Sequence, residues 1–160
     1  MRGIPLKDAI RADCLPGPCS NVAASRSARK ALDEARDEIA SLIGVRPGEV
    51  IFTSGGTESD NTAILGAVRR SGGVAVTSST EHHAVLHPVE HLKGRVVGVD
   101  RAGAIDIDAL EGTLAENNVS IVSVMAVNNE TGAVADLAAI AESVRRLTPD
   151  AIFHSDAVQA

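Results

Sequence analysis

Four short polar segments carry the side chains that could do chemistry. They cover residues 54–58, 80–83, 128–132 and 154–159, and they read SGGTE, TEHH, NNETG and HSDAVQ. Each one follows, or ends, a short apolar run of the kind that forms a strand. Ligands of open α/β sheets bind beyond the carboxyl ends of the strands. We therefore expect the four segments to converge on one ligand.

The first segment, 54–58, places two glycines before a threonine at a predicted helix start. Unpaired backbone N–H groups and the positive end of the helix dipole favour an anion such as phosphate at this position. The segment has neither the lysine of a Walker A loop nor the GxGxxG spacing of a dinucleotide site, which argues against ATP and NAD. A tight turn capped by Thr57 is the alternative explanation.

The second segment begins a series of histidines. His83, His87 and His91 recur every four residues, so an uninterrupted helix would align them and they could bind a metal. Pro88 argues against this, because a proline beyond the first turn disrupts a helix, and we expect no metal site. His82 is either a hydrogen-bonded helix cap or an imidazole that faces a planar ligand and shuttles protons.

The third and fourth segments supply amides and a carboxylate. Asn128 and Asn129 directly follow a predicted buried strand and could donate hydrogen bonds to a ligand, although an Asx turn would use the same residues. Asp156 follows the last predicted strand, and Gln159 lies three residues further on. The Asp156 carboxylate either caps a helix or pairs with a cationic heteroaromatic nitrogen, which needs a fixed negative partner.

Alternating strands and helices must position these segments. The sequence predicts strands over residues 50–53, 74–77, 96–99, 119–127 and 151–154. It predicts helices over residues 25–43, 57–70, 84–92, 108–116 and 136–147. Short Val/Ile-rich strands separated by helices favour a mostly parallel sheet covered on both faces, which is a three-layer α/β/α fold. Residues 1–24 show no sustained period and predict an irregular arm.

Composition limits the possible partners. The 160 residues carry a net charge of −6 and only 1% aromatic side chains, so neither charge nor base stacking favours nucleic acid. No apolar run approaches the roughly 18–20 residues of a membrane span, and the first 13 residues do not resemble a secretory signal. The two cysteines, Cys14 and Cys19, are too few for a disulfide framework. We expect a cytoplasmic protein that binds neither membranes nor nucleic acid.

Taken together, the motifs resemble the cysteine desulfurases, pyridoxal-phosphate enzymes of the class V aminotransferase superfamily with the fold-type I architecture. The matching strings, in this order, are FTSGGTESDNTAILGAV, TSSTEHHAVLHPVEHL, VSVMAVNNETGAV and FHSDAVQA. The resemblance implies that residues 25–160 form an incomplete large domain that binds pyridoxal 5′-phosphate. Residues 1–24 do not match the family.

The resemblance implies a role for each matching residue. Gly56 and Thr57 correspond to the contact with the cofactor phosphate. His82 corresponds to a histidine that stacks on the pyridine ring and takes part in proton transfer, and Asp156 to the aspartate that pairs with the pyridinium nitrogen. An ionised aspartate there keeps the ring nitrogen protonated, which makes the cofactor an electron sink.

Asn129 and Gln159 correspond to the two amide side chains beside the ring hydroxyl. The activity that the family implies is removal of sulfur from L-cysteine, which leaves alanine and an enzyme persulfide. The persulfide feeds iron–sulfur cluster or other thio-cofactor assembly, so the expected partner is a sulfur-acceptor or scaffold protein. Full-length family members are typically homodimers.

Two parts that the family uses are not found in the 160 residues. The family holds its cofactor on a lysine downstream of the Asp-Ala-Val-Gln motif and forms the persulfide on a cysteine much later still. Lys7, Lys30 and Lys93 stand in no such context, and Cys14 and Cys19 precede the first predicted helix. We therefore expect this chain to have no desulfurase activity by itself.

Other functions remain open at this point. Selenocysteine lyases and aminotransferases share the same scaffold. A non-catalytic phosphate- or metal-binding α/β module is an alternative of another class, as is a chain that completes a site together with a second polypeptide.

Overall fold

The computed structural model describes residues 23–116 and 118–160, which divide into two compact units between Phe52 and Thr53. The predicted domain over residues 25–160 spans both units. The predicted irregular arm lies almost entirely outside the described residues. Its last two residues belong to a helix, because α2 (Ala23–Ile43) begins at Ala23.

The first unit consists of α2 and a short 3-10 helix, η1 (Pro47–Glu49). The left-handed backbone of Gly44, with a φ of 72°, ends α2, and the next amide, of Val45, donates 2.9 Å back to the Ala40 carbonyl. This arrangement satisfies a carbonyl that the end of a helix leaves unpaired. The Glu49 carboxylate then accepts a 2.8 Å hydrogen bond from the Arg46 backbone and starts η1.

The prediction of a strand over residues 50–53 is wrong. These residues run from η1 to the next helix without pairing with any strand in the described part of the chain. The apolar side chains that suggested a strand are not covered, since Ile51 is 76% and Phe52 43% exposed. A strand needs a ladder neighbour to be stable, and this run has none among residues 23–116 and 118–160.

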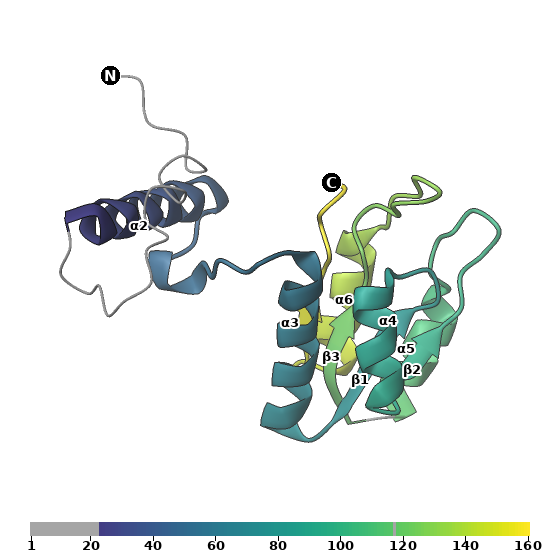
Figure 1. Cartoon of the computed structure of the whole chain (residues 1–160). Helices are drawn as coiled ribbons and strands as arrows, with labels where there is room; N and C mark the ends of the chain where they lie inside the picture. Colours follow the sequence, from purple (N-terminus) through teal and green to yellow (C-terminus); the bar gives the residue numbers. More distant parts are fainter. Residues whose placement is uncertain (1–22, 117) are drawn as a thin grey trace. The chain divides into compact units, whose positions relative to one another are not determined.

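The second unit contains a four-stranded, fully parallel sheet, which confirms the predicted α/β class (Figure 1). The strands are β1 (Val74–Ser78), β2 (Arg95–Val97), β3 (Val119–Ser123) and β4 (Ile152–His154). Their order across the sheet is β2-β1-β3-β4. In the register, Val76 lies beside both Arg95 and Val122, and Val122 lies beside Phe153.

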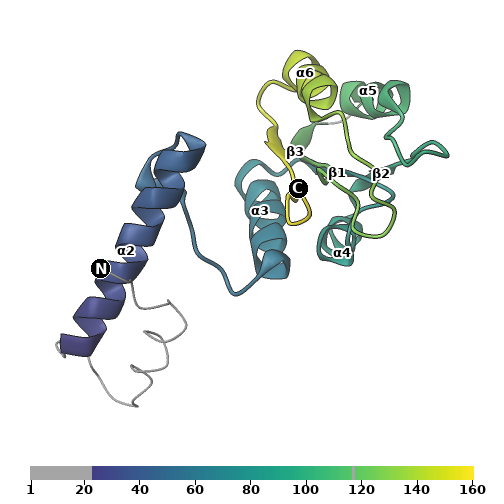
Figure 2. The ribbon, with the colours of Figure 1, turned by 90° about the horizontal axis from the view of Figure 1, so that it is seen from above.

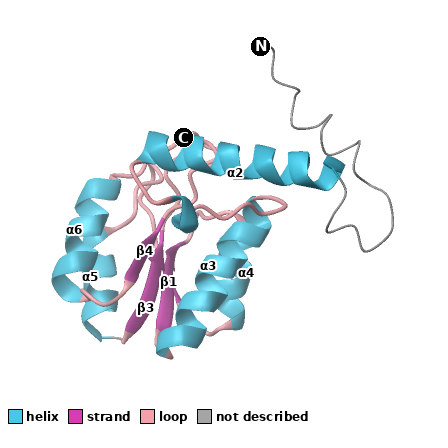
Figure 3. Cartoon of the chain, turned by 90° about the vertical axis from the view of Figure 1, so that its left-hand side faces the viewer, coloured by secondary structure: helices cyan, strands magenta, loops and turns pink. Residues whose placement is uncertain are grey.

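Two helices cover each face of the sheet, so the three-layer prediction is also confirmed (Figures 2 and 3). The helices are α3 (Gly56–Ser71), α4 (His83–His91), α5 (Ile107–Glu116) and α6 (Leu137–Leu147). Helices α3 and α4 lie on one face, and α5 and α6 on the other. Within the described residues, no helix is both long and apolar enough to span a membrane.

Alternation along the strands supplies a core to each face. Ala75 and Ile121 pack with the buried side chains of α3 and α4, whereas their neighbours Val76 and Val122 pack with those of α5 and α6. On the first face the buried helix residues are Ile64, Ala67, Val85 and Val89. On the second face they are Leu110, Leu114, Ile140 and Val144. Strands buried on both faces read as continuous apolar runs, which is why β1 and β3 were readily predicted.

One connection requires a glycine. A Cβ atom at Gly94, between α4 and β2, would lie 2.5 Å from the Ala75 carbonyl oxygen and 2.6 Å from a Val89 methyl group. The backbone can therefore pass this close to β1 only without a side chain.

Candidate functional site

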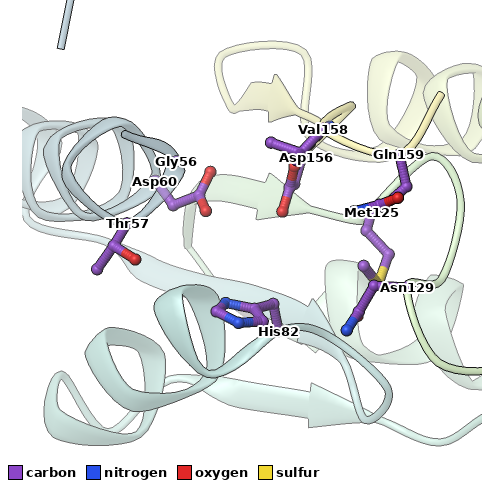
Figure 4. Close-up of a pocket in the computed structure, with 9 residues that line it drawn as sticks. All are labelled: Gly56, Thr57, Asp60, His82, Met125, Asn129, Asp156, Val158 and Gln159. Atoms are coloured by element: carbon purple, nitrogen blue, oxygen red, sulfur yellow. Dashed lines mark hydrogen bonds between the residues drawn. The ribbon is translucent and has the colours of Figure 1, made fainter. Parts of the chain in front are cut away.

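The six predicted site residues line one cavity of about 260 Å³ at the carboxyl edge of the sheet (Figure 4). They are Gly56, Thr57, His82, Asn129, Asp156 and Gln159. The predicted convergence of the four polar segments is thus what the structure shows, while the role of each residue stays a prediction. Three further residues, Asp60, Met125 and Val158, complete the lining.

Gly56 and Thr57 reach the cavity from the first turn of α3, which packs against β1 and β3, and not from the end of a strand. The turn before them is closed by Glu58, whose carboxylate accepts hydrogen bonds from the Ser54 amide (2.7 Å) and hydroxyl (2.6 Å). These two bonds lower the pKa of Glu58. The first N–H groups of a helix have no intrahelical partner, so this turn offers donors to an anion.

His82 caps α4, which confirms one interpretation of this residue, and it also lines the cavity. Its Nδ1 accepts a 3.1 Å hydrogen bond from the Ala84 backbone N–H. An accepting nitrogen carries no proton, so the neutral ring bears its hydrogen on Nε2. Capping therefore selects the tautomer of the imidazole at the cavity.

The adjacent residues Asn128 and Asn129 differ in burial and in their contacts. Asn128 is buried: its amide donates to the Thr80 carbonyl (2.8 Å), and its oxygen accepts from the backbone of Glu130 (2.9 Å) and Thr131 (2.8 Å). It forms the Asx turn that the sequence allowed. Asn129 is exposed and lines the cavity, so the turn made by its neighbour places it there.

Asp156 and Gln159 follow β4 in an irregular segment. The Asp156 carboxylate accepts a 2.9 Å hydrogen bond from the Val158 amide, and its main-chain oxygen accepts a 2.8 Å bond from Ala126. In this segment the Asp156 carboxylate closes a turn with the Val158 amide.

Asp60 is a site residue that sequence reasoning missed. It lies one helical turn after Thr57 in α3, is 4% exposed and has one buried carboxylate oxygen, Oδ2, without a hydrogen-bond partner in the described residues. Burial raises its pKa, as does the nearby Asp156, while His154 and His82 act in the opposite direction. The three-residue spacing from Thr57 was the available signal, because it places both on one helix face.

His154, on β4, connects Asp60 to the sheet. Its Nε2 lies 3.8 Å from Asp60 Oδ1, and its Nδ1 shares a 2.9 Å hydrogen bond with the buried Ser123 hydroxyl. Burial lowers the pKa of His154, although Asp60 and Asp156 partly offset the effect. The lowered pKa favours the neutral imidazole. Two carboxylates in one small cavity, those of Asp60 and Asp156, favour a ligand with a cationic N–H group.

Glu81 is a second buried carboxylic acid that the sequence did not reveal. Its Oε1 accepts hydrogen bonds from the Ser78 hydroxyl (2.7 Å) and the Met125 amide (2.8 Å), and its Oε2 is buried without a partner in the described residues. Burial raises its pKa to about 7. Glu81 thus joins the ends of β1 and β3 and positions Met125 at the cavity.

The histidine series on α4 needs one correction. The helix runs from His83 to His91 without a break at Pro88, and the rings of His83 and His87 stack with their centres 4.9 Å apart. Across residues 23–116 and 118–160, no group of three or more His, Cys, Asp or Glu side chains is arranged to hold a metal ion. Cys14 and Cys19 lie outside these residues.

The lining fits a flat, phosphorylated heterocycle with a protonated ring nitrogen. The first turn of α3 with Thr57 can hold the phosphate, and Asp156 can pair with the nitrogen. The His82 ring can face the heterocycle, while Asn129 and Gln159 can bond a ring substituent. Asp60 is a second carboxylate in the lining, and its buried Oδ2 has no hydrogen-bond partner in the described residues.

Comparison with known sequences gives matches over most of the chain. A family model described as "Aminotransferase class-V" matches residues 19–160. "Cysteine desulfurase IscS" of Pectobacterium atrosepticum is 43% identical over 141 positions, a match that covers 83% of this chain and 34% of the relative. The protein of the same name from Escherichia coli O139:H28 gives the same values. The chain thus spans about a third of the length of the curated relatives it matches.

Solved structures share the fold of the chain. A "NifS-like protein" superposes with a TM-score of 0.83 at 28% identity, over 97% of this chain and 45% of that one. The NifS-like protein from Rickettsia africae gives a TM-score of 0.78 at 28% identity, over 97% and 44%. DndA from Streptomyces lividans gives a TM-score of 0.75 at 31% identity, over 97% and 45%.

Proposed function

The chain belongs to the aminotransferase class-V family, and from this premise we propose that it forms the cofactor-binding part of a pyridoxal-phosphate-dependent cysteine desulfurase. The observation that carries the proposal is the convergence of the six motif residues on one cavity from four separate segments. The similarity to proteins named cysteine desulfurase supports the choice of reaction over that of an aminotransferase or a selenocysteine lyase.

In this proposal, different residues of the cavity bind the phosphate and the ring nitrogen of the cofactor. Thr57 and the first amides of α3 bind the phosphate, since both present donors at the positive end of the helix dipole. The Asp156 carboxylate holds a proton on the ring nitrogen by charge and hydrogen bonding. When bound, pyridoxal 5′-phosphate supplies an electron sink for negative charge that develops on the amino-acid substrate.

His82 has two tasks in this proposal. Its ring would face the cofactor, and Nε2, the ring nitrogen that the cap leaves free, would be the atom of His82 that contacts the substrate in proton transfer. Asn129 and Gln159, which line the cavity, would orient the cofactor by hydrogen bonds to its ring hydroxyl. The helix cap holds the imidazole in place, so little ordering is needed when a ligand binds.

The substrate we propose is L-cysteine, with its sulfur passed to a persulfide and from there to an acceptor or scaffold protein for iron–sulfur cluster or thio-cofactor assembly. We also propose a homodimer and a cytoplasmic location. Neither of the two lysines in the described residues, Lys30 and Lys93, lines the cavity. The 160-residue chain assayed alone should therefore release no sulfide from L-cysteine above a blank without protein.

Titration of the chain with pyridoxal 5′-phosphate tests the cofactor site. The phosphorus resonance and the visible absorbance of the cofactor should change saturably on addition of protein. Asp156→Asn should weaken binding roughly 10- to 100-fold, because a charge-assisted hydrogen bond is lost. The matched control Asp150→Asn removes an exposed carboxylate remote from the cavity lining and should bind like wild type. Absence of saturable binding, or equal affinity of the Asp156→Asn and wild-type chains, would refute the proposal.

A further inference from the structure

Helix α4 contains a proline that should weaken it. Pro88 is buried and is the sixth residue of the helix. A proline has no N–H group, so the carbonyl four residues earlier, that of Ala84, cannot receive its usual intrahelical hydrogen bond. A carbonyl left unpaired in a partly buried position would destabilise the helix.

The missing donor comes from the neighbouring helix. Asn61, in α3, donates from its side-chain Nδ2 to the Ala84 carbonyl at 3.0 Å. The same nitrogen donates to the Thr57 carbonyl at 2.9 Å. One primary amide has two hydrogens, so both bonds can form together.

These contacts connect the two helix ends that face the cavity. The Thr57 carbonyl belongs to the first turn of α3, and the Ala84 N–H is the group that His82 caps at 3.1 Å. Ala84 is therefore held at both backbone groups, by His82 at the nitrogen and by Asn61 at the oxygen. The Asn61 amide is a tether between the turn that carries Thr57 and the turn that carries His82.

We propose that Asn61 is a positioning residue of the site, which replaces the hydrogen-bond donor that Pro88 lacks and so holds Thr57 and His82 at a set separation. The effect of Asn61 on cofactor binding rests on the proposed function. The two hydrogen bonds of Asn61 and their effect on stability do not. Asn61 does not line the 260 Å³ cavity, so it acts through these two residues.

Two substitutions separate the stability effect of the tether from its positioning effect. Asn61→Ala leaves the Ala84 carbonyl unpaired and should lower the folded-to-unfolded ratio about tenfold. Adding Pro88→Ala supplies a helical N–H to the same carbonyl and should restore most of that ratio. The tether between the helices stays broken in the double variant, so positioning should not recover.

The measurements are urea unfolding by circular dichroism and amide resonances of Thr57 and His82 by NMR. Both resonances should shift in Asn61→Ala and in the double variant but not in the control Asn118→Ala, which removes an exposed asparagine amide. The affinity for pyridoxal 5′-phosphate should fall about tenfold in both Asn61 variants, because the site is less preorganised.

If Asn61→Ala lowers the free energy of unfolding by the same amount with and without Pro88→Ala, then Asn61 does not replace the donor that Pro88 lacks, and that part of the proposal is overturned. If the double variant regains both its stability and the wild-type resonances of Thr57 and His82, then Asn61 does not position these two residues. If Asn61→Ala alone does not fold, the double variant must fold for the proposal to stand. A wild-type chain that binds no pyridoxal 5′-phosphate would refute the proposed function. The unfolding and NMR measurements would still test whether Asn61 holds Thr57 and His82 in place.

Discussion

Replacement of Glu81 by glutamine should make the protein more stable at alkaline pH. Glu81 is 6% exposed, and burial raises its pKa from 4.5 to about 7. The folded protein therefore binds a proton between these two pH values that the unfolded chain has released. Stability falls with rising pH wherever the folded state binds more protons, so Glu81 costs stability as the pH rises from about 4.5 through 7.

The size of the effect follows from the pKa shift. A shift of one unit corresponds to about 1.4 kcal/mol, so the shift of Glu81 corresponds to about 3 kcal/mol, most of it lost between pH 5 and pH 8. Glutamine keeps an oxygen for the Ser78 and Met125 donors but does not ionise. Glu81→Gln should thus resemble wild type near pH 5 and exceed its stability by about 3 kcal/mol above pH 8.

The assay is urea unfolding at several pH values, followed by far-ultraviolet circular dichroism because the chain has no tryptophan or tyrosine. The difference between wild type and Glu81→Gln isolates Glu81 from the other titrating groups. Glu90→Gln, which changes an exposed glutamate on α4, is the matched control and should keep the wild-type pH dependence. A Glu81→Gln protein that loses as much stability as wild type between pH 5 and pH 8 would show that Glu81 does not titrate as its burial requires.

Two other predictions concern a glycine and the buried histidine. Gly94→Ala should destabilise the protein by about 2 kcal/mol or more, because its Cβ would meet the Ala75 carbonyl at 2.5 Å, whereas Gly112→Ala in open space on α5 should stabilise it by up to about 1 kcal/mol. Unfolding of both variants checks this, and similar effects of the two would contradict it. The His154 ring should titrate below pH 6.5 by NMR, and Asp60→Asn should lower its midpoint further because a stabilising negative charge is lost. An unchanged or higher midpoint would contradict the coupling.

The parallel sheet could be predicted because β1 and β3 are buried on both faces and read as apolar runs. The predicted strand over residues 50–53 failed because a short apolar run does not reveal whether another strand lies beside it. Two predicted strands, over residues 96–99 and 119–127, ended too late. After Ser123 the chain continues beside β4 through single bonds, such as that from the Val124 amide to the His154 carbonyl at 3.1 Å.

His82, Asn129, Asp156 and Gln159 could be predicted to line the cavity because loops after parallel strands meet at one edge of the sheet, whereas Gly56 and Thr57 lie at a helix start. Asp60 and Glu81 could not, since their importance comes from burial, and a carboxylate in a sequence is usually exposed. The continuity of α4 through Pro88 was equally hidden, because the compensating donor, Asn61, lies on another helix. Local patterns thus indicated the exposed part of the site, and only tertiary contacts revealed what supports it.

Asp156 and Gln159 depend on a short pairing at one side of the sheet. β4 pairs with β3 over three residues, and the segment beyond it is held by the bond from Ala126 to the Asp156 carbonyl. Short elements with few ladder bonds open locally at lower free energy than the core. Fraying of β4 would therefore remove the carboxylate and one amide from the cavity while α3, α4 and β1 stay folded. A ligand that binds Asp156 would in turn slow hydrogen exchange in β4, so the strand would report occupancy of the site.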